Sequence, residues 1–486
     1  MVPPAEQRFD RLTRAANIIL GVGGFFCVLL LLYCFYYYTW TGTRYMTSPG
    51  GMVFYYGLPS ALAALLFASL WVRPLLRISL ALVLVAVAIA IFAANLFYAL
   101  LDFSLIASNR TLWFKESDFE ELVKVAKEHD IEFDTRNKLE VIRDLSSRGI
   151  DAVPSIVPGS LLPVQSDGTR KSVITLDGTE VLPHGGMSNK VTVFCNESGQ
   201  HRFYESDEHG FHNPKGVWSS EQIDVVGLGD SFTQGYCVAS DTNFVALIRR
   251  HYPRTLNLGI NGQGPLMMLA TLRDYGPPLK AKVVLWFFYE GNDLSDLSEE
   301  KQSPLLMHYL QSDFSQPLLQ RQTDIDQALA AFIQTQTASF MLKGKQQEAF
   351  GKKIRNAMFL LEELVKLSPL RQRVGLVYGD RKAPMGLLDK ALREGKKAVE
   401  SWGGKLYFVY LPERNRYSNL TRAMNEREQV LRTVRNVGLP LIDIYNAFRA
   451  QSDPLAFFPF RRLGHYNEEG HRLVAEEVLR SITVGN

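Results

Sequence analysis

The sequence has few cysteines and almost no net charge, and both shortages limit what the protein can be. Four cysteines in 486 residues are too few and too scattered for a disulfide-dense scaffold or a zinc site. A formal net charge of +3 argues against binding nucleic acid through a basic face. The chain also lacks a phosphate-binding Gly-Lys-Ser/Thr loop, and Gly227-x-Gly229 does not continue into a dinucleotide fingerprint. We therefore expect no metal, nucleotide or other cofactor.

The small positive charge is confined to the first quarter of the chain. Residues 1–109 contain six arginines and three acids, so the 47 basic and 47 acidic residues that follow balance each other. The same quarter holds three uncharged apolar runs, 18–40, 52–72 and 78–101, each long enough to cross a bilayer as a helix. We predict a membrane anchor of three transmembrane helices; the alternative is a cleaved signal peptide followed by buried core helices.

The arginines also predict how this anchor is oriented. Arg8, Arg11 and Arg14 precede the first run, Arg73 and Arg77 lie between the second and third, and the first loop has only Arg44. Because basic residues stay on the cytoplasmic side, we expect a multi-pass protein of the cytoplasmic (inner) membrane whose N-terminus is cytoplasmic. Everything after Leu101 is then extracytoplasmic, or periplasmic.

An extracytoplasmic location bears on the two cysteines that follow the anchor. Outside the cytoplasm two thiols can be oxidised to a disulfide. We predict a bond between Cys195 and Cys237, the alternative being two buried thiols.

The remainder of the chain divides into two parts by pattern. Residues 110–220 mix helical spacing with short strands and turns, whereas from residue 221 short apolar strands alternate with helices. That alternation predicts an α/β fold with a doubly wound parallel sheet, a flavodoxin-like three-layer sandwich. Residues 296–385 interrupt it and predict a helical insertion, which could be a lid, a partner surface or simple cover for the core. The expected strands are Ile223–Leu228, Thr255–Leu258, Val283–Tyr289, Leu406–Leu411 and Leu439–Ile444.

Three strand ends carry residues suited to acyl chemistry. Gly229-Asp230-Ser231 follows the first strand, and a serine displayed there can act as a nucleophile if a base is near. Asn257-Leu258-Gly259-Ile260-Asn261-Gly262-Gln263-Gly264 follows the second strand and Gly291-Asn292 the third. A glycine amide, an asparagine side chain and the Ser231 amide would supply three donors to an oxyanion.

A histidine completes this set near the C-terminus. His465 lies after the last expected strand and just before the final helix, from which a loop side chain can reach Ser231. His471 lies further along, within that helix, where we expect a structural or exposed residue.

These four blocks, in this order, resemble the SGNH subgroup of the GDSL esterase/acyltransferase superfamily over residues 221–486. The resemblance implies Ser231 as nucleophile, Gly262 and Asn292 as oxyanion donors beside the Ser231 amide, and His465 as general base. Gly262, rather than Gly259 or Gly264, matches the second block.

The fourth block departs from the family pattern. The family usually has an aspartate three residues before the histidine, and this position is Arg462. Asp453 is the only acid between the last expected strand and His465, so it is the candidate for orienting the imidazole. The other option is a Ser–His dyad.

The resemblance implies a membrane-anchored serine esterase or O-acyltransferase that acts on ester groups, with an extracytoplasmic glycan as the expected substrate. Acyl transfer would require a multi-pass partner to deliver the acyl donor across the membrane. The alternative is a catalytically degenerate protein on the same fold that binds glycan or serves assembly. The balanced charge after residue 109 gives no reason to expect a polyanionic substrate.

Overall fold

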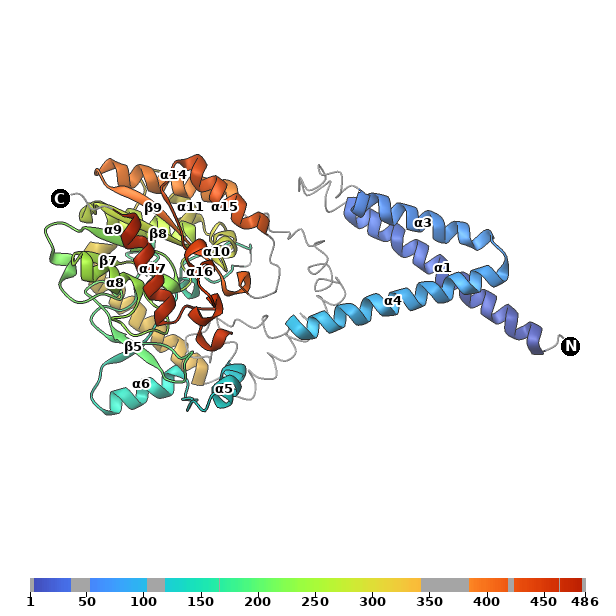
Figure 1. The fold of residues 1–486 in the computed structure, drawn as a ribbon, viewed down its shortest axis with the longest axis horizontal. Helices are drawn as coiled ribbons and strands as arrows, with labels where there is room; N and C mark the ends of the chain where they lie inside the picture. Colours follow the sequence, from blue (N-terminus) through green and yellow to red (C-terminus); the bar gives the residue numbers. More distant parts are fainter. Residues whose placement is uncertain are drawn as a thin grey trace. The chain divides into compact units, whose positions relative to one another are not determined.

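A computed structural model describes seven stretches of the chain, which form two units (Figure 1). The described residues are 4–35, 53–102, 119–165, 167–341, 384–417, 424–462 and 464–482. Residues 4–102 belong to a helical N-terminal unit, and the described residues from 119 onward belong to the second unit.

The N-terminal unit contains two helices that are long and apolar enough to cross a membrane, α1 (Pro4–Phe35) and α4 (Pro74–Asp102). Most of their side chains face outward, as expected for helices that meet lipid. The second predicted span, 52–72, differs from expectation. It is divided into a π-helix η3 (Val53–Gly57), an α-helix α3 (Leu58–Ala68) with Pro59 in its first turn, and a 3₁₀ turn η4 (Ser69–Trp71). The continuous apolar helix Leu58–Trp71 is shorter than the other two.

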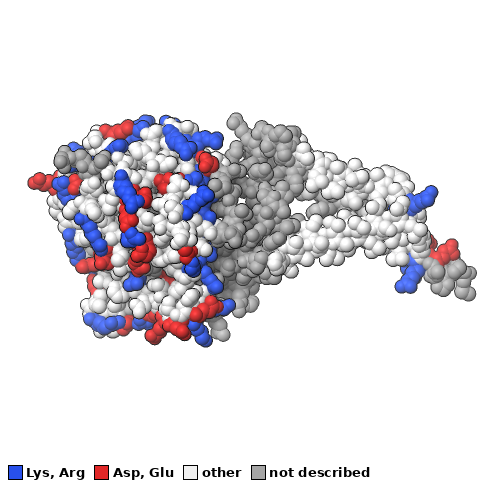
Figure 2. All heavy atoms as spheres, in the orientation of Figure 1, with Lys and Arg blue, Asp and Glu red and all other residues white. Residues whose placement is uncertain are grey.

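Charged side chains gather at one end of this unit (Figure 2). Arg77 at the start of α4 donates a hydrogen bond to the Asn17 side chain of α1 over 3.1 Å. The arginines that precede the first apolar run therefore lie at the same end as those between the second and third. Arg44 and the aromatic end of the first predicted span are outside the described residues.

The second unit contains a five-stranded parallel sheet in the order β10-β9-β8-β6-β7. Its strands are β6 (Val225–Leu228), β7 (Thr255–Asn257), β8 (Val283–Tyr289), β9 (Lys405–Leu411) and β10 (Leu441–Asp443). Strand β6, which comes first in the chain among these five, lies between β7 and β8. The winding direction therefore reverses between β6 and β8. Ligands of such sheets bind beyond the strand ends at this reversal.

Helices cover both faces of the sheet, which confirms the predicted doubly wound α/β fold. Neighbouring residues of β8 point to opposite faces: Trp286 packs against Gly395 of α14, and Phe287 against Phe244 of α8. One face is covered by α9 (Pro265–Leu279), α14 (Met385–Ser401) and α15 (Met424–Val437). The other is covered by α8 (Phe244–His251), α16 (Ile444–Arg449) and α17 (Glu468–Ser481).

The segment before residue 221 packs onto this sheet. Leu161, Leu182 and Phe211 belong to the same hydrophobic core as α9 and β8. The segment contains helices α5 (Phe119–Glu128) and α6 (Lys138–Ser147), a sheet of β1 (Ala152–Pro154), β4 (Val191–Cys195) and β5 (Arg202–Glu205), and a hairpin of β2 (Thr175–Leu176) and β3 (Thr179–Glu180). Two 3₁₀ turns complete it, η6 (Pro158–Leu161) and η7 (Val217–Ser219).

The described part of the predicted insertion is helical. It contains α11 (Pro304–His308), a 3₁₀ turn η8 (Leu318–Arg321) and a helix over 322–341. Helix α10 (Asp293–Glu300) begins just before the insertion and extends into it. The helical face expected at Phe350, Ile354, Met358, Leu361 and Val365 lies outside the described residues.

Candidate active site

Ser231 stands at the first turn after strand β6, which lies between β8 and β7 in the sheet. Asp230 caps the short helix α7 (Ser231–Gln234) by accepting the Phe232 N–H over 3.0 Å. The turn into this helix requires glycine at 229, because a Cβ there would lie 2.1 Å from Thr233 Oγ1. Ser231 is thereby held, only 4% exposed, at the carboxyl edge of the sheet.

His465 meets this serine, as the sequence predicts. The distance from Ser231 Oγ to His465 Nε2 is 2.9 Å. The imidazole contacts the rings of Phe232 and Tyr236, whose centroids are 4.9 Å and 4.5 Å away. The next residue, Tyr466, is buried and donates a hydrogen bond to the Pro412 carbonyl over 2.6 Å. These contacts hold the histidine loop in place.

The other nitrogen of the imidazole contacts a residue that sequence reasoning missed. His465 Nδ1 lies 2.7 Å from Glu197 Oε1, and the Glu197 side chain is buried. A carboxylate at Nδ1 favours a proton on that nitrogen, which leaves Nε2 free to accept the proton of Ser231. Ser231, His465 and Glu197 are thus joined by consecutive hydrogen bonds, the arrangement used for nucleophilic catalysis.

Asp453, the acid expected in that position, lies elsewhere. It precedes the 3₁₀ turn η10 (Pro454–Phe457), is 41% exposed and pairs with Arg461. Arg462 points to Glu128 of α5, at 3.7 Å. The prediction of Asp453 is wrong because the acid at His465 comes from the segment before the sheet, 268 residues away in the chain.

A disulfide explains how such a distant residue reaches the site. Cys195 at the end of β4 and Cys237 after α7 are bonded, with Cα atoms 5.6 Å apart. Glu197 comes two residues after Cys195, and Ser231 six residues before Cys237. The pairing predicted from the sequence therefore contained the clue to the acid, because it places residue 197 beside the serine segment.

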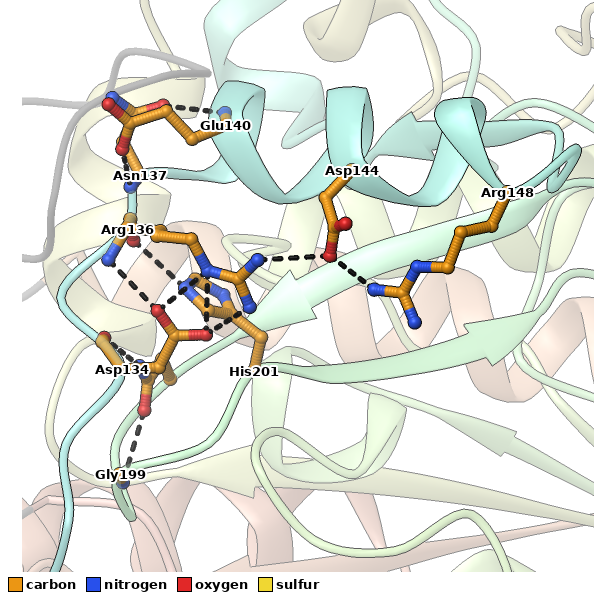
Figure 3. Close-up of polar contacts among 9 residues, drawn as sticks. Asp134, Arg136, Asn137, Glu140, Asp144, Arg148, Gly199 and His201 are labelled. Atoms are coloured by element: carbon orange, nitrogen blue, oxygen red, sulfur yellow. Dashed lines mark hydrogen bonds and ion pairs between the residues drawn. The ribbon is translucent and has the colours of Figure 1, made fainter.

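Hydrogen bonds hold the loop that carries Glu197 from its other side (Figure 3). The Asp134 N–H donates to the Gly199 carbonyl over 2.7 Å, and the Asn196 side chain donates to the Asp134 carbonyl over 2.8 Å. His201 Nε2 lies 2.9 Å from the Arg136 carbonyl. The Arg136 guanidinium binds the Asp134 carboxylate and lowers its pKa. Glu197 therefore lies on a loop that several hydrogen bonds hold in place.

The second block lies beside the serine helix. Asn257 accepts the Gly259 N–H over 2.9 Å and donates to the Thr233 carbonyl of α7 over 2.7 Å. Gly259 allows its backbone to pack closely against α7, because a Cβ there would lie 2.5 Å from Thr233 Cβ. Two residues on, the Asn261 N–H binds the Gln234 side chain of α7 over 2.8 Å.

Gly262 follows in the left-handed conformation, with φ +78°. That conformation favours glycine, and a Cβ there would also lie 2.8 Å from Val157 Cγ1.

The third block ends β8 close to the same serine. Asn292 is the N-terminal cap residue of α10. Burial raises the pKa of Asp230 to about 6, while the Phe232 N–H, His465 and Asn292 each act to lower it. Asn292 and His465 therefore both lie within electrostatic reach of the residue that precedes Ser231.

Buried carboxyl groups lie beneath the strand ends. Asp230, Asp293, Asp296 and Glu300 are all buried, and burial raises the pKa of Asp293 well above its usual range. Glu300 accepts the N–H groups of Gly264 and Leu266 at the start of α9, at 2.7 Å and 2.9 Å. Within the described stretches, no group of three or more His, Cys, Asp or Glu side chains is arranged to hold a metal ion.

We expect Glu300 to make the fold less stable as the pH rises. Burial, reinforced by Asp296, raises the pKa of Glu300 to about 8. The folded chain then binds more protons than the unfolded chain above about pH 4.5, so the free energy of unfolding falls until the pH passes the folded pKa. The effect should be on the order of a few kcal/mol, and Glu300→Gln should remove most of it.

Thermal unfolding of the full chain in detergent, measured from pH 7 to pH 9, checks this expectation. That window avoids the opposite effect of His212 and His471, whose pKa values burial lowers to about 4 and about 3. Glu299→Gln, at the neighbouring and more exposed position, is the control. Equal decline with pH in wild type and Glu300→Gln would contradict the assignment.

No protein-family model and no curated protein sequence matches the chain. Solved structures similar to it include a protein from Desulfitobacterium hafniense DCB-2 described as lipolytic and of the G-D-S-L family, with 13% identity, 54% of this chain and 100% of that chain covered, and a TM-score of 0.31. The lipase/acylhydrolase from Enterococcus faecalis is 14% identical, with 55% and 100% covered and a TM-score of 0.30. The acetyl xylan esterase AlAXEase is 12% identical, with 54% and 100% covered and a TM-score of 0.30. At these identities and scores, the likeness says nothing about activity.

Proposed function

We propose that the chain is a membrane-anchored serine esterase or O-acyltransferase of the SGNH type. The observation that carries the proposal is the hydrogen-bonded line from Ser231 through both nitrogens of His465 to Glu197. A buried serine, an imidazole whose Nε2 meets the serine hydroxyl, and a buried carboxylate on the other imidazole nitrogen are the three parts of acyl-transfer catalysis. The four motif blocks at the strand ends support the same assignment.

The reaction then follows from the positions of these groups. Ser231 Oγ attacks the ester carbonyl carbon while His465 Nε2 takes its proton, and Glu197 stabilises the imidazolium that forms. The Ser231 and Gly262 amides and the Asn292 side chain hold the developing oxyanion. The C–O bond to the alcohol breaks, and His465 returns the proton to this leaving group. Water or an acceptor hydroxyl then attacks the acyl-enzyme, with His465 again as base.

The binding-only alternative loses its main support. It rested on Arg462 standing where the family usually has the orienting acid. Glu197 supplies a carboxylate at His465 from another part of the chain, so the departure at Arg462 does not imply a degenerate site.

The proposed substrate is an acyl ester on an extracytoplasmic glycan, following the motif resemblance to membrane-tethered members that acetylate or deacetylate bacterial glycans. If the acyl group passes to a sugar rather than to water, its donor must come from the cytoplasm. The N-terminal helices carry no charged side chain within their apolar runs. Transfer would therefore require a separate multi-pass protein to deliver the donor.

Two separate incubations of the purified full chain test the activity. One uses an activated acetyl ester and measures turnover, and the other uses a serine-directed phosphonate and measures covalent labelling. We expect turnover of the ester and covalent labelling at Ser231. A chain that neither turns over the ester nor reacts with the phosphonate would favour a binding protein on the same fold.

We further propose three membrane passages, with the N-terminus in the cytoplasm. Supporting this topology are the outward-facing apolar side chains of α1 and α4, the arginines at one end, and the Cys195–Cys237 bond in the second unit. Alkaline phosphatase, which is active only outside the cytoplasm, should be active when fused after Asp102 and inactive when fused after Arg73. The reverse pattern would overturn the orientation.

A further inference from the structure

Arg414 lies beside the loop that carries His465. It begins the 3₁₀ turn η9 (Arg414–Arg416), which follows β9 at the carboxyl edge of the sheet. Two hydrogen bonds tie this segment to the histidine loop: Arg414 Nε donates to the Arg461 carbonyl over 2.8 Å, and Tyr466 to the Pro412 carbonyl over 2.6 Å. The two bonds lie on either side of His465 in the chain. The Arg414 guanidinium is therefore held beside the loop that carries the proposed base.

The arginines around it have carboxylate partners. Arg416 pairs with the buried Glu290, Arg461 with Asp453, and Arg462 with Glu128 at 3.7 Å. Within the described stretches, each of these three arginines thus has a carboxylate beside it, whereas Arg414 has none.

Arg414 is half-buried, and its guanidinium binds only neutral oxygens within the described part of the chain. These are the Arg461 carbonyl and the Asn415 side chain, the latter at 3.2 Å. Burial and the nearby charge of Arg462 both lower its pKa. A partly desolvated charge next to a like charge costs free energy unless an anion compensates it.

The backbone of the histidine loop is held in an unfavourable shape at the same place. Phe460 and Arg461 both have left-handed conformations, with φ of 52° and 58°. Such conformations are uncommon for residues other than glycine and cluster at functional sites. Arg461 is also the residue whose carbonyl accepts the Arg414 Nε–H, so the strained turn and the guanidinium form one local arrangement.

We propose that Arg414 binds an anionic group of the substrate next to the ester, so that the preferred substrate is an acylated acidic sugar. The inference rests on the proposed function and adds a substrate class to it. A guanidinium recognises carboxylate and phosphate by paired, charge-assisted hydrogen bonds. The overall charge of the chain gives no hint of this preference, because the feature is local to the histidine loop.

Matched substrates test the proposal: mono-O-acetylated methyl glucuronoside, the corresponding mono-O-acetylated methyl glucoside, and its 6-phosphate. Acetate release by the full chain should give a kcat/KM about 10-fold higher for an anionic substrate than for the neutral one, the range of one hydrogen bond to a charged group. Preference for the glucuronoside alone, for the phosphate alone, or for both would each support an anion subsite and identify its chemistry. Rates that are equal for all three would overturn it.

Variants separate recognition from a structural role. Arg414→Gln should bring the ratio of anionic to neutral kcat/KM close to 1, and Arg414→Lys should restore part of it. Arg480→Gln, an exposed position on α17, is the control and should keep the wild-type ratio. If Arg414→Gln lowers both rates equally, the arginine only supports the loop and the proposal is wrong. If the wild-type chain turns over none of these esters, nor an activated one, the proposed function itself fails.

Discussion

Replacing Ser231 with alanine should lower ester turnover by about 10⁴–10⁶-fold, because removing the nucleophile leaves only the oxyanion donors and substrate binding. The fold should be unaffected, since the Ser231 hydroxyl contacts the partly exposed His465 and supports no core element. Turnover of an activated acetyl ester by the full chain in detergent, together with phosphonate labelling, measures the loss.

Ser481→Ala is a suitable control for this substitution. Its hydroxyl binds only the Glu477 carbonyl on the exposed face of α17. Retention of more than a tenth of the turnover in Ser231→Ala, or phosphonate labelling of another serine, would contradict the proposed nucleophile.

Glu197→Gln should lower kcat by about 10²–10⁴-fold with little change in KM. A glutamine has nearly the same shape, but it cannot stabilise the imidazolium and can hold His465 in the wrong tautomer. Because the nucleophile and the substrate contacts remain, the loss should fall on the chemical step. Steady-state kinetics on the same activated ester measure this division between kcat and KM.

Asp453→Asn is the matched comparison, because it removes one carboxylate charge from a residue in the C-terminal block. Asp453 pairs with Arg461 at the surface, so we expect activity within about twofold of wild type, as for most surface substitutions. If Asp453→Asn were as damaging as Glu197→Gln, the acid would have to be reassigned to the C-terminal block.

The two acids show which features of this protein can be predicted from its sequence. The strand β8 is predictable because Val283–Tyr289 is an uninterrupted apolar run, and a strand apolar on both faces belongs inside a covered parallel sheet. Ser231 is predictable because it follows the apolar strand β6, and His465 because it lies just before the final helix α17. Glu197 is not, because no local pattern links a residue on a loop after β4 to a histidine 268 positions later.

The second predicted span illustrates a different limit. Composition alone makes 52–72 a candidate span, since every residue in it is uncharged. Composition does not show that the α-helix begins only at Leu58, with Pro59, which has no N–H, in its first turn. The α-helical part is therefore short. Hydropathy therefore predicts where the apolar residues lie better than it predicts how many turns they form without interruption.

If the chain is the extracytoplasmic esterase proposed above, the Cys195–Cys237 bond would make its activity depend on where in the cell it is. A chain still in a reducing cytoplasm would have its serine and histidine on the folded sheet, while the loop bearing Glu197 would lack its covalent link to the serine segment. Oxidation after export would join them. On that proposal, we expect the chain to remain a poor catalyst while its cysteines are reduced, so that export and activation coincide.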